Sequence, residues 1–290
     1  MQVGIDSYSY HRRYGETRVG EAPPAHAPWP LEPGPVLHHA RATGADAVFL
    51  ETCYLPEPEA IDGAMLASGG PDLRVRFSWG HPWPSGRFHG LDGGRWYGAE
   101  LELARWIDAA THLGHDVLRI TAGSPASRGD EPADVLVERL VGPLRRACDR
   151  AADGGLRLAL ENHGDLRAGD ILALFDRVER PETLGVCLDN VNLIRVGDDM
   201  AEGTRALAPH TLLVQLKDHR AGDPTVAGGP VCTALGEGIA DLDGLVAILA
   251  GAGFDGPVCV ELASLGSDDV DELTMIERSV AWLRNHLPVA

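Results

Sequence analysis

Four polar side chains stand at the ends of apolar runs in the second half of the chain. Glu161 closes LRLALE, Asp189 closes LGVCLD, Gln215 lies in LLVQLK and Glu261 lies in PVCVEL. A carboxylate half-buried at the end of a strand is costly unless it is paired, protonated or bound to a cation. Three carboxylates and an amide that converge would form an all-oxygen site for one divalent ion, Mn²⁺ or Mg²⁺ in preference to Zn²⁺. Each acid alone is more often a helix cap or a salt-bridge partner, but four polar groups at matched positions favour the metal site.

The only lysine of the chain, Lys217, follows this pattern by two positions. Residues two apart on a strand share a face, so Gln215, Lys217 and His219 are expected to point into one site, with Asp218 outward as a cap or ion-pair partner. There the Lys217 ammonium could stabilise negative charge on a substrate oxygen. A Schiff-base nucleophile and a structural ion pair with a site carboxylate are the alternatives.

A histidine supplies the candidate acid/base group. His163 lies two residues after Glu161 and is therefore expected on the same face. Its unperturbed pKa of about 6.5 suits a general base near neutral pH. Glu161 and Glu261 are rivals for this role, and a histidine that only orients a metal ligand is the structural alternative.

The elements that must position these residues alternate between strand and helix. Helix-like segments with a 3.6-residue period begin at Gly98, Ala133, Asp241 and Asp271. The alternation predicts a parallel sheet, and eight units in 290 residues match a (β/α)₈ TIM barrel, with a doubly wound sheet as the alternative. Without a break in composition, we expect one domain over 1–290. The eight strand-like runs begin at Val3, Ala47, Leu73, Val117, Leu156, Leu184, Leu212 and Pro257.

Two long segments follow the first and third expected strands. One is Pro-rich, GEAPPAHAPWPLEPGP, and the other is SWGHPWPSGRFHGLDGGRWYG. On a barrel, loops in those places belong to the catalytic mouth, so His11, Arg12 and His81 are candidates for the substrate pocket. Trp79 and Trp83 could offer a stacking face for a sugar, although surface loops and simple packing explain the same residues.

The amino-acid composition restricts which binding partners and which cellular location we expect. The net charge of −18 disfavours nucleic acid and anionic membranes, and favours a neutral small molecule or a locally balanced anion. No apolar run approaches the roughly 20 residues that span a bilayer, and MQVGIDSYSY lacks the pattern of an export signal, so we expect a cytoplasmic protein. The five cysteines have no CxxC spacing and are expected in the core.

Taken in order, LENH at Glu161, GVCLDNVN, VQLKD, LGEG and VCVEL make the whole chain resemble the xylose-isomerase-like TIM barrels, the sugar phosphate isomerases and epimerases. Endonuclease IV is a more distant relative of that group. The resemblance implies that Glu161, Asp189, Gln215 and Glu261 bind the metal. It also implies an enzyme that abstracts a proton beside the carbonyl of a sugar or polyol ketone through a metal-bound enediolate.

Two positions depart from the family pattern. Gln215 stands where most members have histidine, as in VHVKD, and ENHGD stands where keto-sugar epimerases read EPLNR. Dehydratase-like branches are similar to this chain in using an amide. Beside a metal-dependent isomerase or epimerase, the sequence therefore supports a lyase with the same first step, such as a dehydratase or an enzyme that cleaves an oxidised glycoside, including a C-glycoside.

An endonuclease IV-like DNA repair enzyme is disfavoured by the charge, and a non-catalytic barrel would leave the carboxylates unexplained. The sequence leaves open the substrate, the metal, the choice between isomerisation and elimination, and whether the chain forms a homo-oligomer or takes a small partner subunit.

Overall fold

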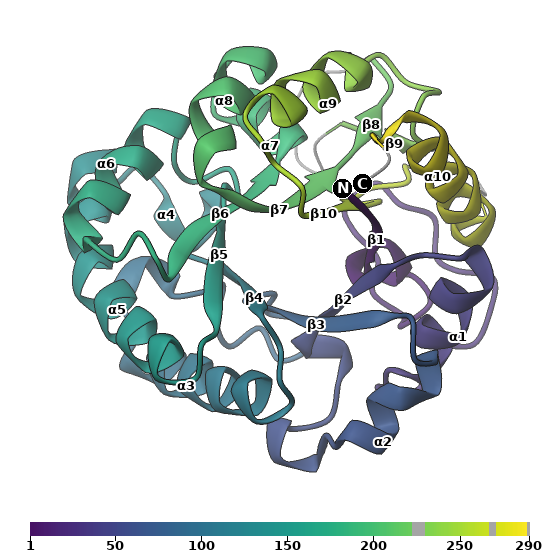
Figure 1. Ribbon diagram of the computed structural model, residues 1–290, viewed down its shortest axis with the longest axis horizontal. Helices are drawn as coiled ribbons and strands as arrows, with labels where there is room; N and C mark the ends of the chain where they lie inside the picture. Colours follow the sequence, from purple (N-terminus) through teal and green to yellow (C-terminus); the bar gives the residue numbers. More distant parts are fainter. Residues whose placement is uncertain (222–229, 267–270, 289–290) are drawn as a thin grey trace.

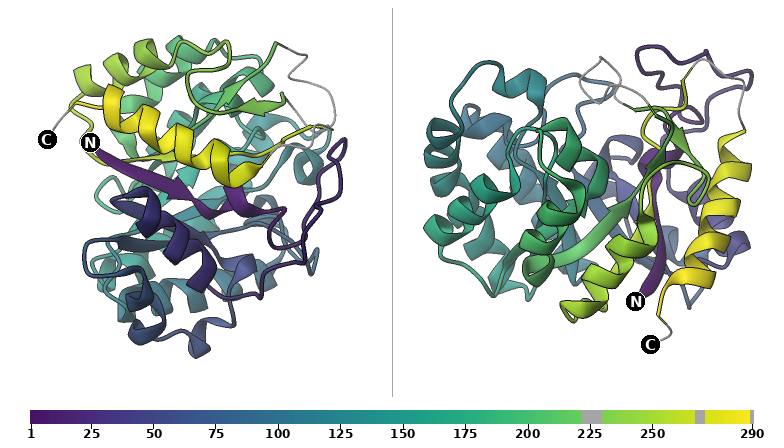
Figure 2. Two further views of the ribbon diagram at one scale, coloured as in Figure 1. Left: turned by 90° about the vertical axis from the view of Figure 1, so that its right-hand side faces the viewer. Right: turned by 90° about the horizontal axis from the view of Figure 1, so that it is seen from above.

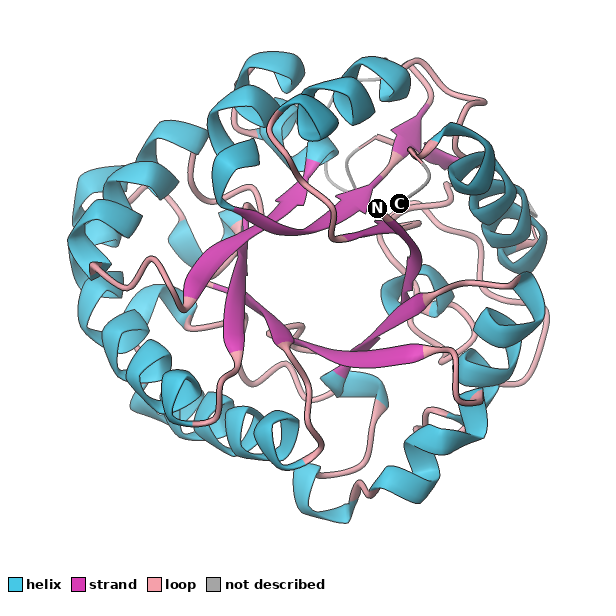
Figure 3. Cartoon of the chain, in the orientation of Figure 1, coloured by secondary structure: helices cyan, strands magenta, loops and turns pink. Residues whose placement is uncertain are grey.

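The computed structural model describes residues 1–221, 230–266 and 271–288. Eight parallel strands close into a barrel (Figures 1 and 3), with each strand paired to the next along the chain and the last paired to the first. The predicted TIM barrel is therefore confirmed, and all eight strand-like runs are its strands. These are β1 (Gln2–Asp6), β2 (Ala47–Glu51), β3 (Arg74–Trp79), β4 (Val117–Thr121), β5 (Arg157–Glu161), β6 (Leu184–Asp189), β7 (Thr211–Leu216) and β10 (Pro257–Val260).

Helices surround the barrel (Figure 3). The four that the periodicity predicts are α3 (Tyr97–His112), α5 (Ala133–Asp153), α9 (Leu242–Gly251) and α10 (Glu272–His286). Asp241 and Asp271 cap the N-termini of α9 and α10 by accepting backbone N–H groups. The other helices of four or more residues are α1 (Gly34–Thr43), α2 (Gly63–Leu66), α4 (Pro125–Arg128), α6 (Ala168–Val178), α7 (Asn190–Arg195) and α8 (Met200–Leu207).

Strand alternation divides the core into two layers. On β5, Leu158 and Leu160 belong to the large cluster that includes residues of the surrounding helices, whereas Ala159 belongs to a small cluster with Phe49 and Cys187 inside the barrel. Glu161 shares the parity of Ala159 and lies next to Cys187 in the β5–β6 register. The same alternation that fills the barrel with small apolar side chains thus turns the last residue of the strand inward.

The carboxyl ends of the strands carry the long loops, and the two termini lie at the opposite end of the molecule (Figure 2). Glycine fixes the loop after β3 to the end of β4. Gly80 has φ +126°, and a Cβ there would lie 2.1 Å from Thr121 Oγ1, while a Cβ at Gly90 would lie 2.3 Å from the Thr121 carbonyl oxygen. This close packing places His81 and His89 beside the barrel mouth.

Beyond β7, the chain forms a feature that the sequence pattern did not indicate. β8 (Asp218–His219) leaves the barrel and pairs antiparallel with β9 (Cys232–Thr233). Asp218 accepts backbone N–H groups from Gly236, Gly238 and Ala240, so it anchors the following loop, as its expected capping role requires. In the ranges that the structure describes, no helix is long and apolar enough to cross a membrane.

Candidate active site

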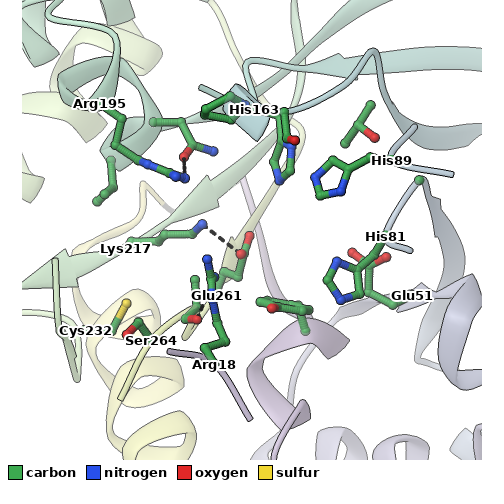
Figure 4. Close-up of a pocket in the computed structure, with 18 of the residues that line it drawn as sticks. Arg18, Glu51, His81, His89, His163, Arg195, Lys217, Cys232, Glu261 and Ser264 are labelled. Atoms are coloured by element: carbon green, nitrogen blue, oxygen red, sulfur yellow. Dashed lines mark hydrogen bonds and ion pairs between the residues drawn. The ribbon is translucent and has the colours of Figure 1, made fainter. Parts of the chain in front are cut away.

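Lys217 lies at the centre of the barrel mouth. Its Nζ is 2.6 Å from Asp189 Oδ2 and 2.7 Å from Glu261 Oε1, and the second pair is drawn in Figure 4. Asn190 fixes the backbone, since its Oδ1 accepts the Lys217 N–H and its Nδ2 donates to the Lys217 carbonyl. Burial opposes the charge, but Asp189 and Glu261 outweigh it and raise the pKa of Lys217. The ammonium therefore stays charged, which disfavours a Schiff-base role.

A second buried cation balances the other side of the site. Arg119 projects from β4, pairs with Glu51 at 3.1 Å and also contacts the carboxylate of Glu161. Burial raises the pKa of Glu51 even though Arg119 opposes the shift. Sequence reasoning missed both residues. Arg119 interrupts the apolar run VLRIT, and Glu51 closes AVFLE just as Glu161 closes its own strand, so the signal was present.

Asp189 and Glu261 both pair with Lys217. Asp189 and Glu161, by contrast, both accept hydrogen bonds from the side-chain amide of Asn192. Asn192 Nδ2 lies 2.5 Å from Asp189 Oδ2 and 3.2 Å from Glu161 Oε1. Asp189 Oδ1 accepts the N–H groups of Val191 and Asn192 and thereby caps α7. Asp189 is thus a helix cap as well as a site carboxylate.

Gln215 turns away from the other three strand-end groups. Its Nε2 donates to Asp6 Oδ2 at 3.0 Å, and its Oε1 accepts the thiol of Cys187 at 3.1 Å. Gln215 is fully buried and does not line the cavity above it. Of the four groups at matched strand ends, Asp189 and Glu261 share the Lys217 ammonium, Glu161 is linked to Asp189 through Asn192, and the Gln215 amide lies against Asp6.

His163 presents one ring nitrogen to the cavity. Its Nδ1 lies 2.7 Å from the carbonyl oxygen of Gly123, which can only accept, so Nδ1 carries the hydrogen and Nε2 holds a lone pair in the neutral ring. Burial, followed by the charges of His89 and Arg119, lowers the pKa of His163 well below its ordinary value. The imidazole is therefore neutral at physiological pH, although it is a weaker base than the ordinary pKa of about 6.5 would make it. Its ring centroid lies 5.3 Å from that of His89.

One cavity of about 280 Å³ is lined by Glu51, Arg119, His163, Lys217 and Glu261, but not by Glu161 or Asp189. The loop after β1 contributes Arg18, the loop after β3 contributes His81 and His89, and α7 contributes Arg195. His81 is held by Glu16, whose carboxylate lies 2.8 Å from His81 Nε2. Residues of the loops after the first and third strands thus line this cavity, at the place where the sequence predicts the catalytic mouth. Figure 4 shows the three histidines on one side of the pocket and Lys217 and Arg195 on the other.

The family follows from comparison with known proteins. The family model described as Xylose isomerase-like TIM barrel matches residues 79–286, more than half of the sequence. This chain belongs to that family. Among curated proteins, the uncharacterized protein YihM of Escherichia coli K12 is 26% identical over 196 residues, which cover 59% of this chain and 60% of YihM.

Solved structures share the fold of this family member at low identity. An L-ribulose 3-epimerase has a TM-score of 0.71 and 17% identity, covering 99% of this chain and 94% of its own. The probable 3-DHS dehydratase AsbF of Bacillus anthracis has a TM-score of 0.69 and 16% identity, covering 98% and 99%. The IolI protein, determined with a zinc atom, has a TM-score of 0.73 and 14% identity, covering both chains fully.

A divalent ion suits this member of the family by charge and donor chemistry. Burial raises the pKa of Glu161 to about 7 and of Glu261 to about 8, although Arg119 and Lys217 oppose the shifts. Five buried carboxylates, including those of Asp6 and Glu51, thus gather around two paired cations. Glu261 Oε2 has no hydrogen-bond partner among the residues that the structure describes. The surplus of negative charge on hard oxygen donors fits a divalent cation.

Lys217 and Arg119 hold these carboxylates in the arrangement seen. Within the described ranges, no three His, Cys, Asp or Glu side chains converge as a set of metal ligands. One carboxylate oxygen of Asp189 and one of Glu261 pair with the Lys217 ammonium. A metal ion that binds both carboxylates must therefore share these oxygens with Lys217.

Four residues predicted to line the substrate pocket lie outside it. His11 stacks on Tyr8 and bonds to Glu21, because it belongs to the 3-10 turn after β1 rather than to the loop tip. Arg12 is buried and pairs with Glu272 of the α10 first turn. His219 leaves with β8 and bonds to the Arg220 carbonyl. Trp83 lines a separate cavity beside Trp79 and packs on Tyr54.

Proposed function

We propose that this protein is an enzyme that removes a proton next to the carbonyl group of a sugar or polyol ketone, in the manner of an isomerase or epimerase. One observation carries the proposal. The neutral imidazole of His163, with a lone pair on Nε2, and the charged ammonium of Lys217 line the same small cavity. Proton abstraction beside a carbonyl requires this combination of a base and a group that stabilises charge on oxygen.

His163 and Lys217 have different roles in the proposed reaction: one moves the proton and the other stabilises charge on oxygen. His163 Nε2 takes the proton, while its Nδ1–H bond to Gly123 keeps the ring oriented. Lys217 faces the oxygen on which negative charge develops, and this interaction is stronger in the transition state than in the ground state. Glu261 lines the same cavity, and its carboxyl group is the rival candidate for moving this proton.

Glu161, Asp189 and Glu261 would hold one Mn²⁺ or Mg²⁺ ion, with Gln215 as a fourth ligand if its amide is released from Asp6. Bound there, such an ion supplies Lewis-acid polarisation of a carbonyl oxygen. The zinc atom reported with IolI supports a divalent site in this fold.

A lyase is the second candidate, and Gln215 favours it. The same first step yields an enediolate, and departure of a β-substituent from it would make the protein a dehydratase or a glycoside-cleaving enzyme. Gln215 replaces the usual histidine, and ENHGD lacks the arginine of the epimerases. The likeness of the fold to a probable dehydratase is consistent with this alternative.

The test uses a panel of 2-keto and 3-keto sugars and their acids in D₂O. Deuterium at the carbon next to the carbonyl, read by NMR or mass spectrometry, is the expected result. Isomerisation returns a saturated product, whereas elimination leaves a conjugated enone that absorbs in the ultraviolet. Absence of exchange across the whole panel, with and without Mn²⁺, would reject the proposed function.

A further inference from the structure

Two arginines of the cavity are not used by the proposed chemistry. Arg18 lies in the loop after β1, and Arg195 is the last residue of α7. Figure 4 shows both side chains extending into the pocket, with Lys217 between them. They therefore flank the ammonium at the place where a substrate would enter.

Neither guanidinium is paired with a carboxylate in the part of the chain that the structure describes. Arg18 Nη1 donates to the Ala263 carbonyl at 2.8 Å, and its guanidinium carbon lies 5.8 Å from the centre of the Tyr8 ring. Arg195 Nη1 donates to Asn192 Oδ1 at 3.0 Å. A guanidinium has five N–H donors, so each of them keeps several for a ligand.

The positive charges of Arg18 and Arg195 lie close enough for Arg18 to affect the pKa of Arg195. Burial lowers the pKa of Arg195, and the charge of Arg18 lowers it further. By contrast, Arg105 on the outside of α3 is paired with both Glu57 and Glu59. Arg18 and Arg195 are thus half-buried cations of the active-site cavity that form no ion pair with a carboxylate among the described residues.

Both arginines are held in place by neighbouring elements. The carboxylate of Glu21 accepts the backbone N–H of Arg18 at 2.8 Å and that of Leu265 at 2.8 Å, which ties the loop after β1 to the loop after β10. Arg195 is fixed through Asn192, which also bonds to Asp189 and Glu161. The positive groups are therefore oriented before any ligand binds.

We infer that the substrate carries an anionic oxyacid group, a carboxylate or a phosphate, which Arg18 and Arg195 bind while its ketone lies at Lys217 and His163. This inference rests on the proposed function. A guanidinium fork matches the paired oxygens of either anion, whereas a neutral sugar would offer the free N–H donors of the two arginines no charged partner. At about 280 Å³ the cavity is small for a ligand site, so the anion and the ketone belong to one small molecule.

The binding test uses isothermal titration calorimetry with D-gluconate, D-glucose 6-phosphate and neutral D-glucitol. At least one anion should bind ten or more times as tightly as glucitol, and the stronger of the two identifies carboxylate or phosphate. Arg18→Gln and Arg195→Gln should each weaken that anion about 10- to 100-fold without changing glucitol, since each loses charge-assisted hydrogen bonds. Arg105→Gln, which removes an exposed arginine outside the cavity, should change nothing, and Arg195→Lys should keep part of the preference.

Anion binding no tighter than that of glucitol, or a preference that survives both glutamine variants in folded protein, would overturn the inference. Deuterium exchange separates this outcome from failure of the proposed function. Exchange into neutral keto-sugars at the same rate as into their acids would keep the proposed function and remove the anion site. Loss of exchange with every ketone, alongside an intact arginine-dependent preference for anions, would keep the anion site and remove the proposed chemistry.

Discussion

Lys217 and Glu261, which directly follow the neighbouring barrel strands β7 and β10, are joined by an ion pair of 2.7 Å. The same ammonium lies 2.6 Å from Asp189 on β6. Lys217 therefore neutralises two of the predicted metal ligands and also faces the substrate cavity. Its two roles, ion-pair partner and catalytic charge, can be separated by substitution.

Lys217→Met retains most of the side-chain stem and removes the charge. If the ammonium stabilises an oxyanion, kcat should fall by roughly 10²- to 10³-fold, the loss typical of one such donor. Lys217→Arg should rescue poorly, because a planar fork does not fit the place of a compact ammonium. Steady-state kinetics on folded variants provide the measurement. Equal kcat for lysine and arginine would reduce Lys217 to a charge-balancing residue.

Divalent ions should compete with Lys217. We expect Mn²⁺ to raise the melting temperature of chelator-treated protein, since a ligand at 100 times its Kd adds about 2.7 kcal/mol to the free energy of unfolding. Glu261→Gln should abolish the shift, and Lys217→Met should tighten Mn²⁺ binding because it frees carboxylate oxygens of Asp189 and Glu261. Calorimetric titration would measure the affinity. Identical melting of the stripped and Mn²⁺-loaded wild type would rule out the metal site.

Arg119→Met should destabilise the protein by about 3 to 5 kcal/mol, because it leaves Glu51 and Glu161 buried without their cation. The matched control is Arg105→Met, which breaks exposed pairs and should change the free energy of unfolding by less than about 1 kcal/mol. Urea unfolding at pH 7 compares the two. Equal effects would show that the Arg119 pairs contribute no more than a surface ion pair.

Glu21 should make stability depend on acid pH. Burial opposes its ionisation, but His11 and the N–H groups of Arg18 and Leu265 lower its pKa from 4.5 to about 2. A carboxyl whose pKa is lower in the folded state stabilises above about pH 4.5, and this stabilisation is lost as pH falls toward 2; here it amounts to at most about 3 kcal/mol. Relative to wild type, Glu21→Gln should be less stable at pH 7, with the difference shrinking below pH 4.5. A difference independent of pH would contradict this account.

The barrel and much of the site follow from local pattern. Apolar runs mark the strands, and a polar residue at the end of each run marks the mouth, which is why Glu161, Asp189 and Glu261 could be predicted to converge. Gln215 could not be placed, since its partner Asp6 comes from the other end of the chain and meets it only when the barrel closes. His219 was misplaced because strand alternation assumes a regular strand, and the chain leaves the barrel after β7.

Among the loop residues, His81 was predicted at the mouth and lines the cavity, whereas Arg18 carried no usable signal. Arg18 lies in irregular chain near the Pro-rich segment, and only the folded loop, tied by Glu21 to the loop after β10, brings it to the cavity. His11 seemed as good a candidate by position, yet its turn buries it. Within a strand, the spacing of residues predicts the face to which each side chain points. Outside strands, tertiary contacts decide which side chains reach the site.

Solvent-hydrogen exchange in His163→Ala tests the central claim most directly. With a ketone that wild type labels in D₂O, the variant should incorporate deuterium next to the carbonyl at least about 10²-fold more slowly, the usual contribution of a general base. Its melting temperature should still rise with Mn²⁺ as in wild type, which shows that the carboxylates remain in place. Exchange at the wild-type rate in His163→Ala would contradict the account and transfer the base to Glu161 or Glu261.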